Sequence, residues 1–281
     1  MAGPEAYHGA ASNGISYVRI GESRPPLVVF DEMKLEHKPV EGLVLQGLVE
    51  MYEDYAERFT VFVLEPPREM PLDYGLSDIA SDYAAALEEL VTEPATALGL
   101  GFGGMVALRF ALRYPQRLNG LVLAAAAHRL TEPAAELAEQ WIAWAQELDW
   151  GRVHESMIRN VFANRVVGRF YGWLVRLAPA LLGTPEYPWD FVVSLRAQLS
   201  EELESELPRI GTPVLCIAGE KDFYYGREDV ERMVELLPNA ELELFPAQGH
   251  GIIRSRKRRI RELVSSFAAP SHSGDEPEPR D

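Results

Sequence analysis

The 281-residue sequence predicts an α/β protein built on a mostly parallel sheet. The short segment at 27–30 is fully apolar, as in a strand buried on both faces, and further short, largely apolar segments at 60–64 and 118–125 also predict strands. Segments with the helical spacing of apolar residues lie between them, and strands that alternate with helices form parallel sheets covered on both faces. The length and the 47% hydrophobic composition fit one globular domain with an insertion.

Short apolar segments bounded by Gly, Pro and polar residues recur along most of the chain. Residues 15–20 alternate apolar and polar side chains, as a half-buried strand does, whereas residues 1–14 predict a flexible N-terminus. Ser77 is the expected N-cap of the second helix. In order, the sequence predicts strands at 15–20, 27–30, 60–64, 95–98, 118–125, 213–218 and 241–245, and helices at 42–58, 78–90, 103–113, 228–237 and up to about 267.

The alternation of strands and helices stops between residues 131 and 207, a stretch with no convincing strand. We therefore expect a core of residues 15–130 and 208–268, with a helical lid at 131–207 inserted into it. The polar, proline-rich residues 269–281 predict a disordered tail. The helices of the lid are expected at 133–148, 153–163, 167–182 and 189–207.

The charge and composition of the chain exclude several classes of partner. Its net charge of −16 predicts repulsion from nucleic acid and from anionic membrane surfaces. No apolar run is long enough to cross a bilayer, and the first residues lack the basic head and apolar core of a signal peptide. Cys216, the one cysteine, predicts no disulfide. We expect a cytoplasmic protein that acts on a small molecule; the sequence gives no indication of its oligomeric state.

The centre of the sequence carries a glycine-rich turn between a strand and a helix. The strand at 95–98 runs into this turn, and the helix at 103–113 follows it. A strand, a sharp turn and a helix are the setting of the nucleophile elbow, G-x-S-x-G. Gly99 and Gly103 occupy the outer positions of that motif, but Gly101 stands where the serine would be.

The same turn also matches the dinucleotide fingerprint G-x-G-x-x-G, through Gly99, Gly101 and Gly104. Alone, this match is a weak signal. A Rossmann unit usually opens its domain and has an acidic residue about 20 positions further on. Here strands precede the glycines, and no acid follows the strand at 118–125. A nucleotide-dependent oxidoreductase is therefore the last of the alternatives.

Two further motifs, together with the elbow, resemble the α/β-hydrolase family over residues 15–267. In that family the nucleophile, an acid and a histidine follow one another along the chain. Asp222 lies just past the first strand after the lid, and His250 lies between glycines after the last strand. The resemblance implies that Asp222 orients His250, which acts as a general base or acid. It also implies a sheet of about eight strands with a lid inserted after the strand that follows the elbow helix.

The expected lid is rich in aromatic side chains, and all five tryptophans of the chain fall within it. Trp141 and Trp144 are three residues apart and so share a face of their helix. Most such residues pack a lid onto its sheet, but this composition also suits a pocket for an apolar or aromatic ligand. We expect Trp141, Trp144, Phe170 and Trp173 to line the substrate pocket.

Two positions depart from the hydrolase pattern. Gly101 supplies no nucleophile, and glycine adopts the strained elbow conformation freely. The loop after the strand at 27–30 begins with Asp31 and Glu32, where the family often has a small neutral pair beside the oxyanion hole. The N–H of Phe102 would remain as an oxyanion donor, but a carboxylate on the neighbouring loop opposes a developing oxyanion.

Together, these departures predict a naturally diverged, non-hydrolytic enzyme of lyase, isomerase, cyclase or dehydratase type. Asp222 and His250 would form its acid–base pair and act on an apolar small molecule, and no cofactor or metal is implied. Two alternatives stay open at this point. One is an esterase or thioesterase in which the serine at 101 has been replaced by glycine, and the other is a ligand-binding pseudoenzyme with a relic Asp–His pair.

Overall fold

Eight strands form a single sheet in the computed structural model, which describes residues 4–22, 25–177 and 185–268. The strands are β1 Ala6–Ala10, β2 Ser16–Ile20, β3 Pro26–Phe30, β4 Thr60–Leu64, β5 Ala95–Leu100, β6 Leu118–Ala124, β7 Val214–Gly219 and β8 Ala240–Phe245. They are ordered β1-β2-β4-β3-β5-β6-β7-β8. β2 pairs antiparallel with β1 and β4, and every other pair is parallel. The predicted α/β class with a mostly parallel sheet is confirmed.

The N-terminal segment contains a strand that the sequence analysis did not predict. β1 pairs with β2 from Ala6 opposite Ile20 to Ala10 opposite Ser16, so the prediction that residues 1–14 are flexible is wrong for this stretch. The side chains of β1 are largely exposed and show no apolar alternation, because backbone hydrogen bonds rather than burial hold this edge strand. The predicted disordered tail lies outside the described residues.

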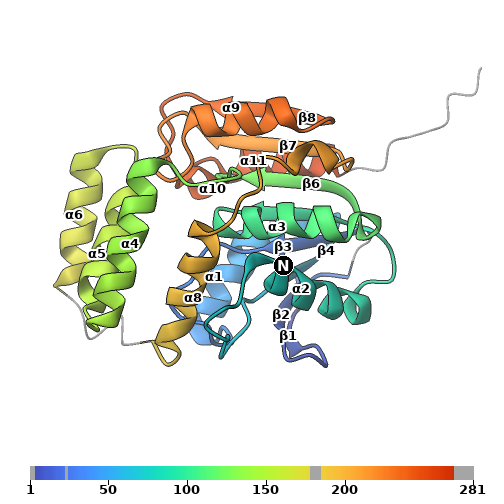
Figure 1. Ribbon diagram of the computed structural model, residues 1–281. Coiled ribbons are helices and arrows are strands. Elements are labelled where there is room, and N and C mark those ends of the chain that lie inside the picture. The colour runs from blue at the N-terminus through green and yellow to red at the C-terminus, as the bar shows by residue number, and fades with distance from the viewer. Residues whose placement is uncertain (1–3, 23–24, 178–184, 269–281) are drawn as a thin grey trace, which may run out of the picture.

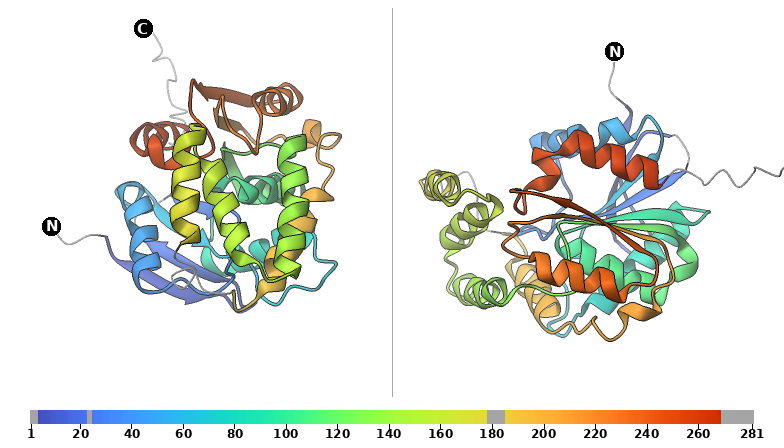
Figure 2. Two further views of the ribbon diagram at one scale, coloured as in Figure 1. Left: turned by 90° about the vertical axis from the view of Figure 1, so that its left-hand side faces the viewer. Right: turned by 90° about the horizontal axis from the view of Figure 1, so that it is seen from above.

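Helices cover both faces of the sheet (Figure 2). On one face lie α1 Gly42–Tyr52, α10 Ile252–Ser255 and α11 Lys257–Phe267, and on the other lie α2 Leu76–Leu90, α3 Phe102–Arg113 and α9 Arg227–Leu236. Successive strand residues point to opposite faces. Val28 accordingly packs in the layer of α2 and α3, and Val29 packs in the layer of α1 and α11.

The second helix begins earlier than the predicted cap. α2 starts at Leu76 with Gly75 as its N-cap, so Ser77 lies inside the first turn. The Gly75 N–H donates a hydrogen bond of 2.9 Å to Oδ2 of Asp78. The side chain three residues after the cap thus satisfies the cap backbone, which is half of a capping box, and no cap hydroxyl is needed.

Four α-helices lie between β6 and β7 within the described residues, where the sequence predicts a lid. They are α4 Glu132–Gln146, α5 Trp150–Val161, α6 Arg165–Arg176 and α8 Pro188–Leu199. α4, α5 and α6 stand side by side at the edge of the sheet where the parallel strands end (Figure 1). α8 ends before the predicted residue 207, and part of the helix predicted over 167–182 lies outside the described residues.

The described helices are short compared with the thickness of a bilayer. None of those in residues 4–22, 25–177 and 185–268 is both long enough and apolar enough to span one. The longest of them, α2 and α4, have 15 residues each. A spanning helix needs about 20 predominantly apolar residues.

Candidate active site

The glycine-rich turn lies between β5 and α3, at the edge of the sheet that faces the helical insertion. Gly101 adopts φ 52° and ψ −117°, a conformation that residues with a side chain rarely take. For a non-glycine residue this conformation costs of order 1–3 kcal/mol, whereas glycine adopts it without a steric penalty. The backbone therefore has the geometry of an elbow, but no side chain projects from it.

The other glycines of the turn permit close packing of α3. A Cβ atom on Gly103 would lie 2.1 Å from the carbonyl oxygen of Phe30, and one on Gly104 would lie 2.3 Å from Cβ of Ala126. Only glycine allows α3 to approach β3 and the end of β6 this closely. A Cβ atom on Gly99 would likewise lie 2.7 Å from Cα of Gly104, and Gly101 has a positive φ, so backbone packing accounts for the G-x-G-x-x-G spacing without any nucleotide.

His250 and Asp222 form a hydrogen-bonded pair beside Gly101. They lie on the loops that follow β8 and β7, and these loops meet because parallel neighbours end at the same edge of the sheet. Nδ1 of His250 lies 2.9 Å from Oδ2 of Asp222. The backbone N–H groups of Tyr224 and Tyr225 donate hydrogen bonds of 2.8 and 3.2 Å to Oδ1, and these bonds fix the carboxylate.

The surroundings of His250 favour its protonated form. Burial is the largest single influence and disfavours the imidazolium, but the charge and hydrogen bond of Asp222 and the charge of Glu32 act in the opposite direction. Together these groups raise the pKa of His250 above its ordinary value of 6.5. The Tyr224 ring packs edge-to-face on the imidazole, with 4.7 Å between the ring centroids. Nε2 lies 3.5 Å from the position that a Cβ atom on Gly101 would take.

Glu32 brings a carboxylate to the same space. Its Cγ lies 3.8 Å from the position of a Cβ atom on Gly101. Within the part of the chain that the structure describes, this carboxylate accepts no hydrogen bond and forms no ion pair. Burial raises the pKa of Glu32, and the neighbouring His250 offsets part of that rise. Two titratable groups with raised pKa values therefore flank the elbow.

Asp31 and Glu32 do not act alike, although the sequence analysis expected both to face an oxyanion. Oδ1 of Asp31 accepts a hydrogen bond of 2.9 Å from the Glu32 N–H, and Oδ2 lies 3.0 Å from Nζ of Lys34. Asp31 does not line the cavity beside His250, whereas Glu32 does. The prediction for Asp31 is corrected, because its charge is paired with Lys34 and directed elsewhere.

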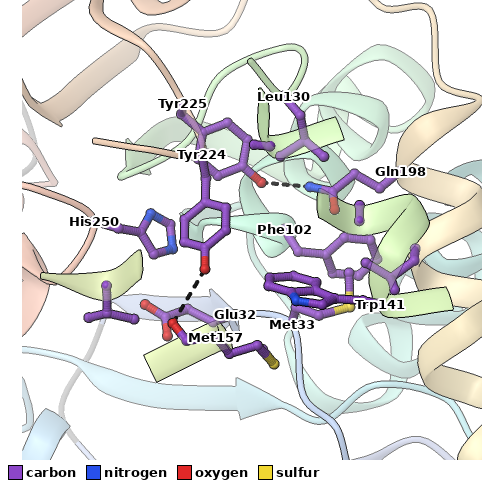
Figure 3. Close-up of a pocket in the computed structure, with 14 residues that line it drawn as sticks. Glu32, Met33, Phe102, Leu130, Trp141, Met157, Gln198, Tyr224, Tyr225 and His250 are labelled. Carbon is purple, nitrogen blue, oxygen red and sulfur yellow. Dashed lines mark hydrogen bonds between the residues drawn. The ribbon is translucent and has the colours of Figure 1, made fainter. Parts of the chain in front are cut away.

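A cavity of about 90 Å³ lies beside His250 and Glu32, under the helical insertion (Figure 3). Phe102, the first residue of α3, lines it from the elbow side. Trp141 of α4 lines it from the insertion and is itself almost fully buried. The apolar walls are completed by Met33, Leu130, Ala134, Ala138, Met157, Val161 and Leu195.

The other three aromatic residues predicted for the pocket do not line this cavity. Phe170 and Trp173 lie on α6 with more than half of their surface exposed, at 55% and 53%. α6 packs mainly on the outer side of α5, so α5 separates it from the cavity (Figure 1). Trp144 is half-buried against the core, about one turn further along α4 than Trp141. These three predictions are corrected.

The polar groups of the cavity include residues that the sequence analysis missed. The Gln198 side-chain amide donates a hydrogen bond of 2.7 Å to the Tyr225 hydroxyl (Figure 3). The only sequence signal for Tyr225 is its position three residues after Asp222, and nothing marked Gln198. Among the described residues, no group of three or more His, Cys, Asp or Glu side chains is placed to hold a metal ion.

A family model described as serine aminopeptidase, S33, matches residues 72–257, which is more than half of the sequence. The chain belongs to this family of α/β-hydrolases. The match spans the elbow, the helical insertion and both members of the hydrogen-bonded pair, and it confirms the resemblance drawn from the sequence motifs.

Relatives and solved structures agree with the family. The pimeloyl-[acyl-carrier protein] methyl ester esterase of Nitrosomonas europaea is 27% identical over 77% of this chain and 87% of its own length. The cis-3-alkyl-4-alkyloxetan-2-one decarboxylase of Shewanella oneidensis is 22% identical over 91% of this chain and 85% of its own. A hydrolase from Pseudomonas aeruginosa PA01 has a TM-score of 0.75 at 22% identity, over 94% of this chain and 98% of that one. The relatives are enzymes, most of them hydrolases, and the structural likeness shows the fold.

Proposed function

We propose that this member of the S33 family is a non-hydrolytic enzyme that transfers protons on a small, largely apolar substrate. The observation that carries the proposal is the space beside Gly101, which no nucleophile enters and which His250 and Glu32 flank. Imidazole and carboxyl groups are the usual general acids and bases of enzymes. The absence of a side chain at residue 101 leaves room for a substrate atom next to both groups.

The raised pKa values give the two groups complementary roles. In the pH range where Glu32 is ionised and His250 is protonated, Glu32 accepts a proton and His250 donates one. Asp222 supports this state, because its carboxylate orients the ring and stabilises the imidazolium. The sequence alone indicated Asp222 and His250, and the position of Glu32 at the cavity wall supports its proposed role as the base.

The reaction follows from these roles. Glu32 removes a proton from a carbon atom, and the C–H electron pair forms a new C=C bond. The displaced electrons move to an oxygen atom, which takes the proton from Nε2 of His250. When that oxygen stays attached, the product is an enol and the step is part of an isomerisation; when its bond to carbon breaks, the step is an elimination. Proton exchange with product or water restores both groups.

The same geometry disfavours acyl transfer. Phe102 opens α3, so its N–H has no acceptor within the helix and is available to an oxyanion. However, the Glu32 carboxylate faces the same space and opposes an anion there. Most relatives are hydrolases, so this chain would use the scaffold of hydrolases for a different reaction.

The test is the base-catalysed ring opening of 5-nitrobenzisoxazole, in which removal of one C–H proton releases a coloured phenolate. We expect the unmodified protein to exceed Glu32→Gln by about a hundredfold, the usual contribution of a general base. Asp31→Asn is the matched control, because it removes a charge from the same loop without altering the cavity wall. Equal rates for the unmodified protein and Glu32→Gln would overturn the proposal.

A parallel assay with 4-nitrophenyl acetate separates the alternatives. The proposal expects no burst of nitrophenol and no acetylated protein by mass spectrometry, because residue 101 has no hydroxyl. A burst would indicate an acyl-transfer enzyme instead. A ligand-binding pseudoenzyme would catalyse neither reaction above the rate of the His250→Gln variant.

A further inference from the structure

We call the cavity beside His250 and Glu32 the catalytic cavity. A polar groove lies on the opposite side of α5 from it. It encloses about 620 Å³ between α5, α6 and the loop that follows β7. Met157 and Val161 of α5 line the catalytic cavity, whereas Arg159 and Asn160 of the same helix line the groove. Asp222 borders the groove while its carboxylate holds the catalytic imidazole, so the two sites adjoin at this residue.

The groove gathers positive charge in a chain whose net charge is −16. Asp222 is the one acidic residue among those that line it, and its carboxylate is engaged by hydrogen bonds. By contrast, Arg176, elsewhere on α6, is paired with Glu155. The cations of the groove, none of which forms an ion pair within the described part of the chain, are Arg159, Arg165, Arg169 and Lys221.

We propose that this groove binds the phosphate-bearing end of a small molecule. Guanidinium groups present planar, paired N–H donors that match phosphate oxygens, and four uncompensated cations favour a ligand with two or more negative charges. The volume lies within the range of about 300–1,000 Å³ that is typical of small-molecule sites. Phe162 and Phe223 add apolar surface for the organic part next to the phosphate.

The ligand is assigned as the substrate itself, and this part of the inference rests on the proposed function. The catalytic cavity, at about 90 Å³, is small and mostly apolar, so a charged part of the substrate would lie outside it. α5 and the loop after β7 contribute to both sites. The substrate class is therefore a small apolar group carried on a phosphorylated tail.

The test is calorimetric titration of the full-length protein with pyrophosphate at low ionic strength. We expect saturable binding that weakens as sodium chloride is added. Arg165→Ala and Arg169→Ala should each weaken the affinity about tenfold or more, the loss expected for one charge-assisted hydrogen bond. Arg176→Ala is the matched control on the same helix and should change the affinity by less than about twofold, because that residue lies outside the groove.

Three outcomes would overturn the proposed site: no saturable binding of pyrophosphate, no effect of salt on the affinity of the unmodified protein, or an equal loss of affinity in the Arg176→Ala control.

Flotation with phosphatidylglycerol vesicles distinguishes lipid headgroups from soluble phosphate. Binding to vesicles without binding of pyrophosphate would overturn the small-molecule assignment. Thermal unfolding confirms that each variant is folded. Pyrophosphate binding does not require turnover. If the protein binds pyrophosphate but fails the benzisoxazole test, the proposed chemistry is wrong and the phosphate site is still supported.

Discussion

A Cβ atom on Gly101 would lie 3.5 Å from Nε2 of His250, at ordinary van der Waals distance. The position is therefore open to a side chain, although the sequence places none there. Asp222 nevertheless holds the imidazole by a hydrogen bond of 2.9 Å, as an orienting acid holds a catalytic histidine. The protein thus combines an elbow without a nucleophile with an oriented acid–base group.

The proposed roles predict a bell-shaped dependence of kcat/KM on pH for benzisoxazole opening. Activity requires ionised Glu32, whose pKa is raised above 4.5 by burial, so the acidic limb lies above pH 4.5. Protonated His250, whose pKa lies above 6.5, also stabilises the developing phenolate oxygen, so the basic limb lies above pH 6.5. Rates measured from about pH 4 to pH 10 define both limbs. An acidic limb that persists in Glu32→Gln would contradict the assignment of the base.

Glu32 is expected to lower the stability of the protein at neutral and higher pH. Its pKa is higher in the folded protein than in the unfolded chain, so the folded state binds the proton more tightly. Folding stability is consequently lost as the pH rises from about 4.5 through the raised value. We expect Glu32→Gln to have a higher Tm than the unmodified protein at pH 8, and an equal Tm below about pH 4.

Asp31→Asn is the control for this stability measurement. It removes the neighbouring acid and its ion pair with Lys34 at 3.0 Å, so it should give no gain in Tm at any pH. A Glu32→Gln protein that is less stable than the unmodified one at pH 8 would show that the carboxylate holds the loop in place. Glu32 would then have a structural role as well as its proposed role as the base.

Asp222→Asn should lower the pKa of His250. The charge and hydrogen bond of Asp222 are the main influences that raise this pKa against the effect of burial. The pKa, followed through the Cε1 proton in NMR spectra, should fall, and the basic limb of the rate profile should move to lower pH with it. Glu220→Gln, which removes a partly exposed acid paired with Arg227, should leave the His250 titration unchanged. An unchanged pKa in Asp222→Asn would show that the pair is not coupled in solution.

The parts of the site that depend on topology could be predicted from the sequence. Asp222 and His250 each follow a strand of a parallel sheet, so the order of the elements is enough to bring them to one edge. The direction of a loop side chain is not encoded in this way. Asp31 and Glu32 are adjacent and chemically alike, yet Lys34 pairs with one and the cavity receives the other.

The composition of the pocket was equally hard to predict from spacing. The aromatic residues of the insertion lie on several helices, and periodicity shows which residues share a face but not which helix covers the cavity. α5 lies between the cavity and α6, so Phe170 and Trp173 are exposed while Met157 is a wall residue. β1 was not predicted for a related reason. It is an exposed edge strand, so its sequence lacks the alternation of apolar and polar residues that a buried face would require.

Gly101→Ser is expected to cost stability without creating an efficient esterase. Serine at φ 52° would be strained by of order 1–3 kcal/mol, which should lower the Tm by several degrees. Its hydroxyl would lie near Nε2 of His250, but the Glu32 carboxylate would still oppose the oxyanion. We expect hydrolysis of 4-nitrophenyl acetate at least about a hundredfold below the typical enzyme turnover of about 10 s⁻¹.

The decisive measurement combines this serine with neutralisation of residue 32. Glu32→Gln should raise ester hydrolysis in the Gly101→Ser background and have little effect in the glycine background, because the carboxylate and the serine would act on one transition state. The gain should correspond to roughly 1–3 kcal/mol, somewhat less than the contribution of a single oxyanion-hole donor, which is about 2.7–4 kcal/mol. Asp31→Asn should give no such gain, since its carboxylate is paired with Lys34. Full esterase activity from Gly101→Ser alone would mean that Glu32 does not face the reacting oxygen, and the proton-transfer assignment would lose its base.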